Sequence, residues 1–383
     1  MLATLVAAQG SDSLIRQLVA EVSQDSVEGT IRCLQDFGTR EAKTDSNKAA
    51  VQYVLRRMTD FGCDTAYLQP FDTLYGFGPN VVGMKRGRLF PDIQFVLLGH
   101  IDCIADPPDS APGANDNASG VAALLEACRV LGGEWFNYTI IFITQNAEEY
   151  TSGASYYAMW ARQRGDSILG VLNLDMVGYA LDGQDSVIAL GKMVDPDCSV
   201  LLNGFCFSTQ EYTALKVRRV AASIDTLYGY DHIYFWMFDY PALTVTATVT
   251  DPCHHTRGDT IGPYHYEQCG VNDLPMCTEV AKAVVATMAV LAQVEGRPAV
   301  AEQQPGVAQG GGTPSVVRGL FMLHGDRTQN TRAELTNVEG RSVLVPHPGP
   351  NDVSKLTPGV YFIRERSAVG GERPAVHKVV LTR

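Results

Sequence analysis

Short apolar runs alternate with segments of helical periodicity between residues 80 and 296, and this alternation constrains the fold more than any other feature. The strand-like runs are NVVGMKRG (80–87), IQFVLLG (93–99), YTIIFIT (138–144), ILGVLNLDMVG (168–178) and ALTVTAT (242–248). The helical patterns are GVAALLEACRVL (120–131), SGASYYAMWARQRG (152–165) and VNDLPMCTEVAKAVVATMAVLAQVEG (271–296). Strands alternating with helices predict an α/β fold with helices on both faces of the sheet. Strands that are nearly all apolar are expected at its centre.

The flanking segments define the rest of the organisation. Apolar spacings of three and four predict two helices within residues 12–62, with a turn at FGTR (37–40) between them. Residues 298–315 are rich in Gly, Pro, Gln and Ala, which predicts a flexible linker. Short strand-like runs fill residues 316–383 and predict a small all-β, sandwich-like module. The first domain is therefore expected over residues 10–297.

Composition excludes several classes of partner. The formal net charge is −12 and no basic stripe occurs, which argues against nucleic acid and anionic membranes. No apolar run reaches the roughly 20 residues that cross a bilayer, so no membrane span is expected. Residues 1–9 hold a short apolar run that ends in small residues before Gln9, typical of the last part of a secretory signal peptide; the alternative is an ordinary first helical turn.

The nine cysteines contain no CxxC spacing, so a structural zinc site of the cysteine type is not expected. Their pairing cannot be assigned from sequence. Cys33 and Cys63 flank a helical segment and could form a disulfide if the protein is exported.

Acidic and histidine side chains lie within or after four of the predicted strands. They are His100, Asp102 and Asp116 after the second run, Glu148 and Glu149 after the third, Asp175 within the fourth, and His254 and His255 after the fifth. Each feature alone is ordinarily a solvated loop or helix start. In an open α/β sheet, however, ligands bind outside the carboxyl ends of the strands. The combination of imidazole and carboxylate therefore predicts a site for divalent metal ions there.

The number of donors suits two zinc ions. Zinc ions that keep a position open for water need about three protein ligands each. The residues available are His100, Asp175, Glu149, one of His254 and His255, and a bridging Asp116. Glu148 is then left over, beside a ligand, where a general base is needed.

Five motifs resemble one known family in order and spacing: HID (100–102), PGANDNASG (112–120), NAEEYTSGASYYA (146–158), LNLDMVGY (172–179) and HHTRGDT (254–260). They are similar to the co-catalytic dizinc exopeptidases of the bacterial leucyl aminopeptidase type, which form peptidase family 28 of the metallo class. Glutaminyl cyclases and the transferrin receptor are related to this family. The resemblance implies the zinc exopeptidase fold, in which helices flank a central mixed sheet.

The resemblance also assigns roles. It implies that His100, Asp116 and Asp175 bind one zinc and that Asp116, Glu149 and His255 bind the other. His255 is preferred to His254 because the family's ligand directly precedes a Thr, here Thr256. Glu148 matches the general base, which would take the proton of the zinc-bridging water. Asp102 matches the carboxylate that orients the imidazole of His100.

The segment TLYGYDHIYFWMFDYPAL (226–243) resembles the family's Asp-His element near the substrate pocket, with Tyr230 where many members have Ser. Tyr228, Tyr230, Asp231 and His232 are therefore candidate pocket residues. A tyrosine hydroxyl could donate to the oxyanion, although plain packing is the alternative. Phe235, Trp236 and Phe238 are expected either in an apolar pocket wall or in the core.

Residues 316–383, with LTPGVYF (356–362) and a closing basic strand, resemble the carboxy-terminal sorting and Ig-like domains of exported bacterial proteins. A secreted or cell-surface bacterial protein, recognised by secretion machinery and acting as a monomer on peptides, is expected. The alternative is an intracellular module for protein contacts. The function predicted overall is a secreted dizinc aminopeptidase. A metallocarboxypeptidase, a glutaminyl cyclase and a non-catalytic binding protein are the alternatives.

Overall fold

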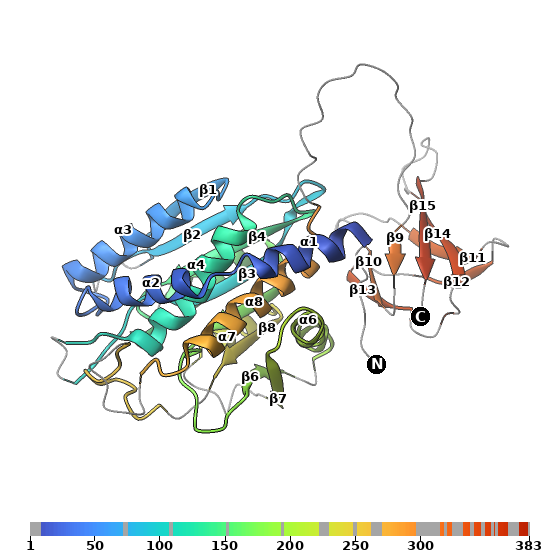
Figure 1. Cartoon of the computed structure of the whole chain (residues 1–383). Coiled ribbons are helices and arrows are strands. Elements are labelled where there is room, and N and C mark those ends of the chain that lie inside the picture. Colours follow the sequence, from blue (N-terminus) through green and yellow to red (C-terminus); the bar gives the residue numbers. More distant parts are fainter. Residues whose placement is uncertain are drawn as a thin grey trace, which may run out of the picture. The chain divides into compact units, whose positions relative to one another are not determined.

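The computed structural model describes residues 9–71, 76–106, 110–150, 153–192, 195–221, 230–247, 251–261 and 270–295, and the strands between 315 and 381 with short adjoining stretches (Figure 1). The chain divides into two units. One is Leu14–Gly296, and the other combines Arg297–Arg383 with the N-terminal residues to Ser13. The expected signal-peptide segment and linker fall almost wholly outside the described residues, so both stay predictions.

A central eight-stranded sheet organises the unit Leu14–Gly296. Its order is β1-β2-β4-β3-β5-β8-β6-β7. The strands are β1 (Thr65–Gln69), β2 (Asn80–Lys85), β3 (Phe90–His100), β4 (Tyr138–Gln145), β5 (Ser167–Leu174), β6 (Ser186–Gly191), β7 (Lys216–Ala221) and β8 (Ala242–Thr246). The neighbours β4, β3, β5 and β8 are parallel, whereas β2 and β6 pair antiparallel with β4 and β8. The predicted α/β fold with a mixed central sheet is confirmed.

Helices flank this sheet: α1 (Gln9–Ala20), α2 (Gln24–Gln35), α3 (Asp45–Asp60), α4 (Gly120–Leu131), α5 (Gly153–Arg164), α6 (Pro196–Tyr212), α7 (His232–Trp236) and α8 (Leu274–Leu291). Helices α4 and α8 lie side by side over the sheet, and α4 contacts β3 (Figure 1). Val96 and Leu98 of β3 instead join Tyr157 of α5 and Ile233 of α7 in one buried cluster. The alternation of side chains along β3 thus allows it to contact a helix layer on each side.

Helix α8 is long and apolar enough, by length and composition, to cross a membrane. This helix is nevertheless 72% buried inside the structure, and it packs against α4 and α6. These contacts are those of the core helix of a globular domain.

The prediction of two helices within residues 12–62 is wrong, because the described residues there form three. Helix α2 was missed because Gly29 and Thr30 are poor helix formers in its middle. Packing overrides that propensity, since Val27, Ile31 and Leu34 are fully buried. Ser23 caps the helix by accepting a hydrogen bond from the N–H of Ser26 at 3.3 Å.

The suggested disulfide between Cys33 and Cys63 is also wrong. Both thiols are free, and the Cys63 Sγ lies 3.4 Å from the Sγ of Cys128 instead. Cys253, in contrast, is disulfide-bonded.

The described residues of the C-terminal unit are strands in two sheets. One sheet has the order β12-β11-β14-β15-β9 and the other pairs β10 with β13. The strands are β9 (Ser315–Val317), β10 (Leu320–Leu323), β11 (Arg332–Asn337), β12 (Ser342–Leu344), β13 (Gly349–Asp352), β14 (Gly359–Arg366) and β15 (Ala375–Leu381). The pairings are antiparallel, except that β9 runs parallel to β15.

Candidate metal centre

The predicted ligands meet at one edge of the sheet. The parallel strands β3, β4, β5 and β8 all end there, which places the residues that follow them side by side. His100 is the last residue of β3 and Asp175 directly follows β5. Glu148 and Glu149 form the short helix η2 (Glu148–Tyr150) after β4.

Asp116 lies at the centre of the cluster. Its Oδ1 is 3.1 Å from the Nε2 of His100, which is itself 3.6 Å from Oδ1 of Asp175. On its other side, Oδ2 is 3.2 Å from the Nε2 of His255, and that nitrogen is 3.2 Å from Oε2 of Glu149. One carboxylate therefore faces two groups of donors, with one oxygen toward each.

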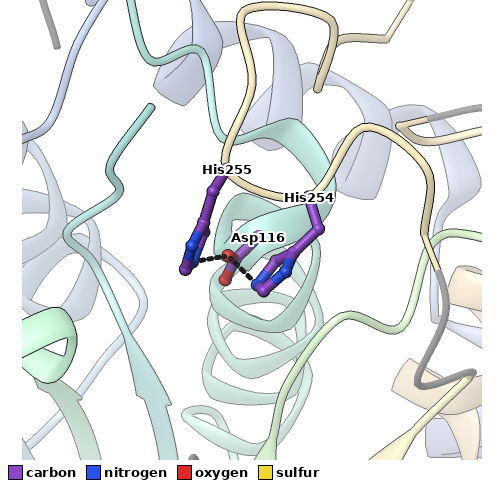
Figure 2. A group of neighbouring side chains, drawn as sticks. All are labelled: Asp116, His254 and His255. Carbon is purple, nitrogen blue, oxygen red and sulfur yellow. Dashed lines mark ion pairs between the residues drawn. The ribbon is translucent and has the colours of Figure 1, made fainter. Parts of the chain in front are cut away.

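Both histidines of the HHT motif reach this carboxylate (Figure 2). The Nε2 of His254 also lies 3.2 Å from Oδ2 of Asp116, and the two imidazole rings are tilted by 32° with their centroids 3.7 Å apart. His255 additionally contacts Glu149, and its choice as the ligand stays a prediction. The sequence analysis offered both histidines as candidates, and the structure brings His254 to Asp116 as well.

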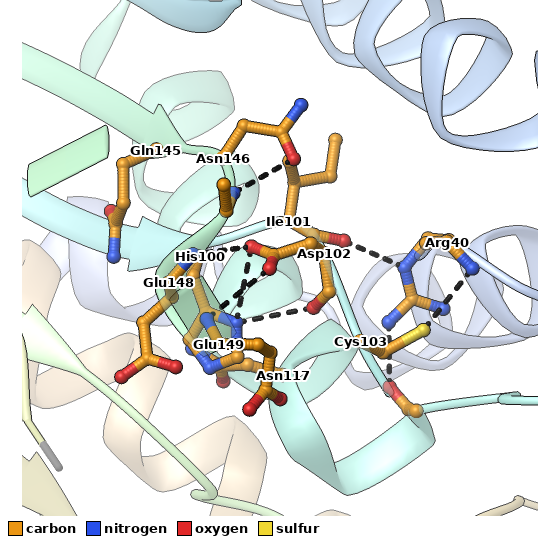
Figure 3. A network of polar contacts seen from close by, with 12 residues as sticks. Arg40, His100, Ile101, Asp102, Cys103, Asn117, Gln145, Asn146, Glu148 and Glu149 are labelled. Carbon is orange, nitrogen blue, oxygen red and sulfur yellow. Dashed lines mark hydrogen bonds and ion pairs between the residues drawn. The ribbon is translucent and has the colours of Figure 1, made fainter. Parts of the chain in front are cut away.

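Asp102 connects two of the ligand-bearing segments (Figure 3). The Nδ1 of His100 lies 3.1 Å from the backbone oxygen of Asp102 and 3.7 Å from its carboxylate. That carboxylate accepts the N–H groups of Glu148 and Glu149 at 3.1 and 3.4 Å. It therefore fixes η2 relative to β3, while the carbonyl orients the imidazole so that Nε2 faces the other ligands.

Asp259 was missed by the sequence analysis although it lies in the HHTRGDT motif. Its two carboxylate oxygens accept the N–H groups of Asn115 and Asp116 at 2.7 and 2.9 Å. The side chain of Asn115 donates to Asp251 at 2.7 Å. These bonds hold the backbone of η1 (Ala114–Ser119) at Asp116, where φ is −108° and ψ is 93° and the chain is not helical.

Arg40 was also missed, because a single arginine in a turn gives no signal. It is 1% exposed, and its guanidinium donates to four backbone oxygens: Leu34, Ile101, Pro112 and Gly113, at 3.0, 2.9, 2.6 and 2.8 Å. The end of α2, the end of β3 and the segment before η1 are thereby joined. Gly113 has a φ of +54°, and a Cβ there would lie 2.7 Å from the guanidinium.

Burial determines the electrostatics of the acidic groups. Burial, reinforced by the charge of Asp231, raises the pKa of Glu148 well above its usual value. It also raises the pKa values of Asp175 and Glu149. Burial opposes ionisation of Asp116 too, but hydrogen bonds from the three imidazoles outweigh it and hold this pKa well below its ordinary value.

The donor set fits zinc. Imidazole nitrogens and carboxylate oxygens are its usual ligands besides thiolates. Among the described atoms, Oδ1 of Asp175 and Oε1 of Glu149 are buried without a hydrogen-bond partner. Buried carboxylate oxygens that accept no hydrogen bond and lie beside other carboxylates are costly unless a cation compensates them.

The four candidate pocket residues differ in burial and in their contacts. Tyr228 lies outside the described residues, and Tyr230 is half-buried. Asp231 is buried and accepts a hydrogen bond from Gln145. His232 is fully buried; its Nδ1 is 2.7 Å from Oγ1 of Thr244, and burial lowers its pKa to about 3.

The three aromatic residues of the same segment belong to core packing. Phe235 and Trp236 are buried members of the cluster between β3 and α5, and Phe238 packs against it. The alternative of core packing therefore holds for them.

Comparison with known proteins identifies the family. The sequence model of peptidase family M28 matches residues 80–273, more than half of the chain. The chain belongs to peptidase family M28. The matched segment contains every predicted ligand of this M28 chain.

Relatives agree with this assignment. A probable zinc metalloprotease of Leptosphaeria maculans is 32% identical over 187 residues, which cover 43% of each chain. A probable leucine aminopeptidase of Trichophyton verrucosum is 25% identical over 270 residues, 65% of this chain and 70% of the relative. The LapA aminopeptidase of Legionella pneumophila shares the fold, with a TM-score of 0.63 and 19% identity over 76% of this chain and 77% of that one.

These comparisons support a zinc metallopeptidase at the level of the family. The match to the first of these relatives spans less than half of its length. The curated relatives named here are fungal, so a bacterial type of this family stays a prediction, as does the sorting role of the C-terminal unit.

Proposed function

We propose that this chain is a dizinc aminopeptidase that removes N-terminal residues from peptides. The observation that carries the proposal is the position of Asp116, whose two oxygens face two donor groups. His100 and Asp175 would complete one zinc site. Glu149 and His255 would complete the other.

Glu148 is proposed as the general base. Bound zinc would supply Lewis acidity and lower the pKa of a coordinated water. A carboxylate oxygen of Glu148 lies within 4.8 Å of ligand atoms of His100 and Glu149, close enough to take a proton from a water held there. Its raised pKa suits it to keep that proton and then deliver it to the leaving amine.

The charges of the site favour the amino end of a peptide. The groups that converge are carboxylates and imidazoles, and the nearby guanidinium of Arg40 is already bonded to backbone oxygens. Two bound zinc ions would offset the ligand carboxylates, but Glu148, Asp102 and Asp231 lie beside them and would still attract a free substrate ammonium in preference to a terminal carboxylate. The name of the Trichophyton verrucosum relative points the same way.

The test combines zinc analysis with a substrate panel. We expect about two zinc ions per chain and chelator-sensitive release of chromophore from free-amino substrates, with little turnover of N-blocked peptides. Preferential cleavage of N-blocked peptides at their free carboxyl end would indicate a carboxypeptidase. One zinc with cyclisation of an N-terminal Gln peptide would indicate a glutaminyl cyclase, and neither activity would indicate a binding protein.

We also propose that the enzyme is secreted or displayed at the cell surface. The apolar residues 1–9 and the disulfide-bonded Cys253 support this, because disulfides persist in oxidising compartments. Fractionation of the producing cells would test it, and recovery in the cytosol alone would contradict it.

A further inference from the structure

Two thiols outside the metal centre lie in contact. Cys63 follows α3 and is half-buried, while Cys128 lies near the end of α4 and is buried. Their Sγ atoms are 3.4 Å apart although 65 positions separate them in sequence. A disulfide needs a separation of about 2.05 Å, which a small side-chain rotation can supply if the backbones are already close.

The backbones at this junction do touch. A Cβ on Gly62 would lie 3.0 Å from the backbone oxygen of Gly132. A Cβ on Gly132 would overlap the backbone oxygen of Phe61. The buried ammonium of Lys85 bridges the two segments, donating to the oxygens of Gly132 at 2.8 Å and Gly62 at 3.4 Å. The two sulfurs therefore face each other across a well-packed contact.

We propose that Cys63 and Cys128 are a redox-active thiol pair that closes to a disulfide by exchange with a small-molecule or protein disulfide. The thiolate of Cys63 attacks the oxidant RSSR, forming a mixed disulfide and releasing RS⁻. The thiol of Cys128 then loses its proton and attacks the Cys63 sulfur, releasing a second RS⁻. The two protein thiols are oxidised, and the disulfide oxidant is reduced to two thiols.

The surroundings assign the order of attack. Cys63 is the more accessible sulfur, so an oxidant reaches it first. The hydrogen bond shared with Cys63, together with burial, raises the pKa of the Cys128 thiol well above its ordinary value. Cys128 therefore stays protonated until a mixed disulfide forms beside it, as a resolving thiol does.

Closure would constrain the part of the chain that carries two of the proposed ligands. The segment between the two cysteines includes β2, β3 and η1, with His100 and Asp116. A crosslink across a long loop stabilises mainly by restricting the unfolded chain. The gain should therefore appear in stability, and it does not depend on the proposed peptidase activity.

The test begins with the folded full-length protein, reduced, desalted and incubated with oxidised glutathione. We expect peptide mapping without reduction to find a Cys63–Cys128 linked peptide. The melting temperature should rise by roughly 5 to 10 °C and return after dithiothreitol. Cys33→Ser and Cys206→Ser remove thiols of similar exposure and are the matched controls, which should keep this shift.

Cys63→Ser should abolish both the linked peptide and the shift. Glutathione adducts on Cys63 without a linked peptide in the wild-type chain would overturn the proposal. So would alkylation of both thiols after oxidation. These readouts on the wild-type protein decide the matter even if a variant fails to fold.

Discussion

Glu148 is the residue whose removal should separate metal binding from catalysis. It adjoins Glu149 but is not needed in either proposed set of zinc ligands. Glu148→Gln is expected to retain the zinc content of the wild type and to lose about 10²- to 10⁴-fold in kcat. Metal analysis and steady-state kinetics on one preparation measure both. The control Glu279→Gln alters a carboxylate paired with Lys282 on α8 and should be neutral; turnover near wild type in Glu148→Gln would remove this residue from the mechanism.

The two adjacent histidines should contribute unequally to zinc affinity. His255 contacts both Asp116 and Glu149, whereas the ion pair of His254 is with Asp116. His255→Gln is therefore expected to lower the affinity for the zinc bound by Asp116, Glu149 and His255 far more than His254→Gln does. Titration against a chromophoric chelator gives the two dissociation constants. A larger loss in the His254 variant would transfer the ligand role to that residue.

His232 should make the domain sensitive to acid. Burial lowers its pKa to about 3 in the folded state. The imidazole is therefore neutral in the folded protein, and its protonation favours the unfolded chain. This contribution is present above the unfolded pKa of about 6.5 and is lost as the pH falls below it. Between pH 7 and 5 the wild type should lose about 2 kcal/mol more than His232→Gln, in urea unfolding of the metal-free proteins. Parallel pH dependences would show that the imidazole is protonated without unfolding.

At the scale of elements, Arg40 joins α2, β3 and the segment before η1, so it should act on ligands it does not touch. Arg40→Met leaves four buried carbonyls without their donor. We expect the unfolding free energy to fall by about 3 kcal/mol or more and zinc affinity to fall roughly 10- to 100-fold. Arg40→Lys keeps the charge but has only three donors, so its unfolding free energy and zinc affinity should lie between those of the wild type and of Arg40→Met.

Urea unfolding and zinc titration would measure the two effects of these Arg40 variants separately. Unchanged zinc affinity in a destabilised variant would mean that Arg40 supports the fold and not the position of Asp116.

The sequence predicted those strands and helices whose own residues show an apolar run or an apolar periodicity. The apolar runs 93–99 and 138–144 lie within β3 and β4, and the helix over 120–131 matches α4 in full. The segment 186–221 was not predicted, although it holds β6, α6 and β7. In β7 the side chains of Lys216, Arg218 and Arg219 are exposed, so an apolar strand pattern is absent there.

The candidate site was predictable as far as parallel strands bring their ends together. His100, Glu149 and Asp175 follow directly from that rule. The contacts of Arg40 and Asp259 could not be predicted, because both side chains bind backbone atoms far away in the sequence. Such bonds depend on how loops pack, and no periodicity of the sequence indicates them.

At the scale of the whole molecule, the unit Leu14–Gly296 contains every residue assigned to the site. Its C-terminal boundary is set by contacts after α8. The N–H of Tyr138 donates to Ala292 O at 3.1 Å, and that of Glu295 donates to Trp135 O at 2.8 Å. Val294 also forms a β-bridge with Phe136. These residues therefore belong to the peptidase unit even though the last helix ends at Leu291.

Two truncations separate the role of this boundary from that of the C-terminal unit. A chain ending at Gly296 should keep its zinc content, and its kcat/KM should stay within about twofold, because the core and the ligands are complete. A chain ending at Leu291 loses the bonds to Trp135 and Tyr138 and should melt at a lower temperature, since the start of β4 is left with unpaired backbone groups. Calorimetry and the substrate panel on both chains measure this difference. Loss of soluble, active protein at Gly296 would instead show that residues 297–383 stabilise the peptidase unit.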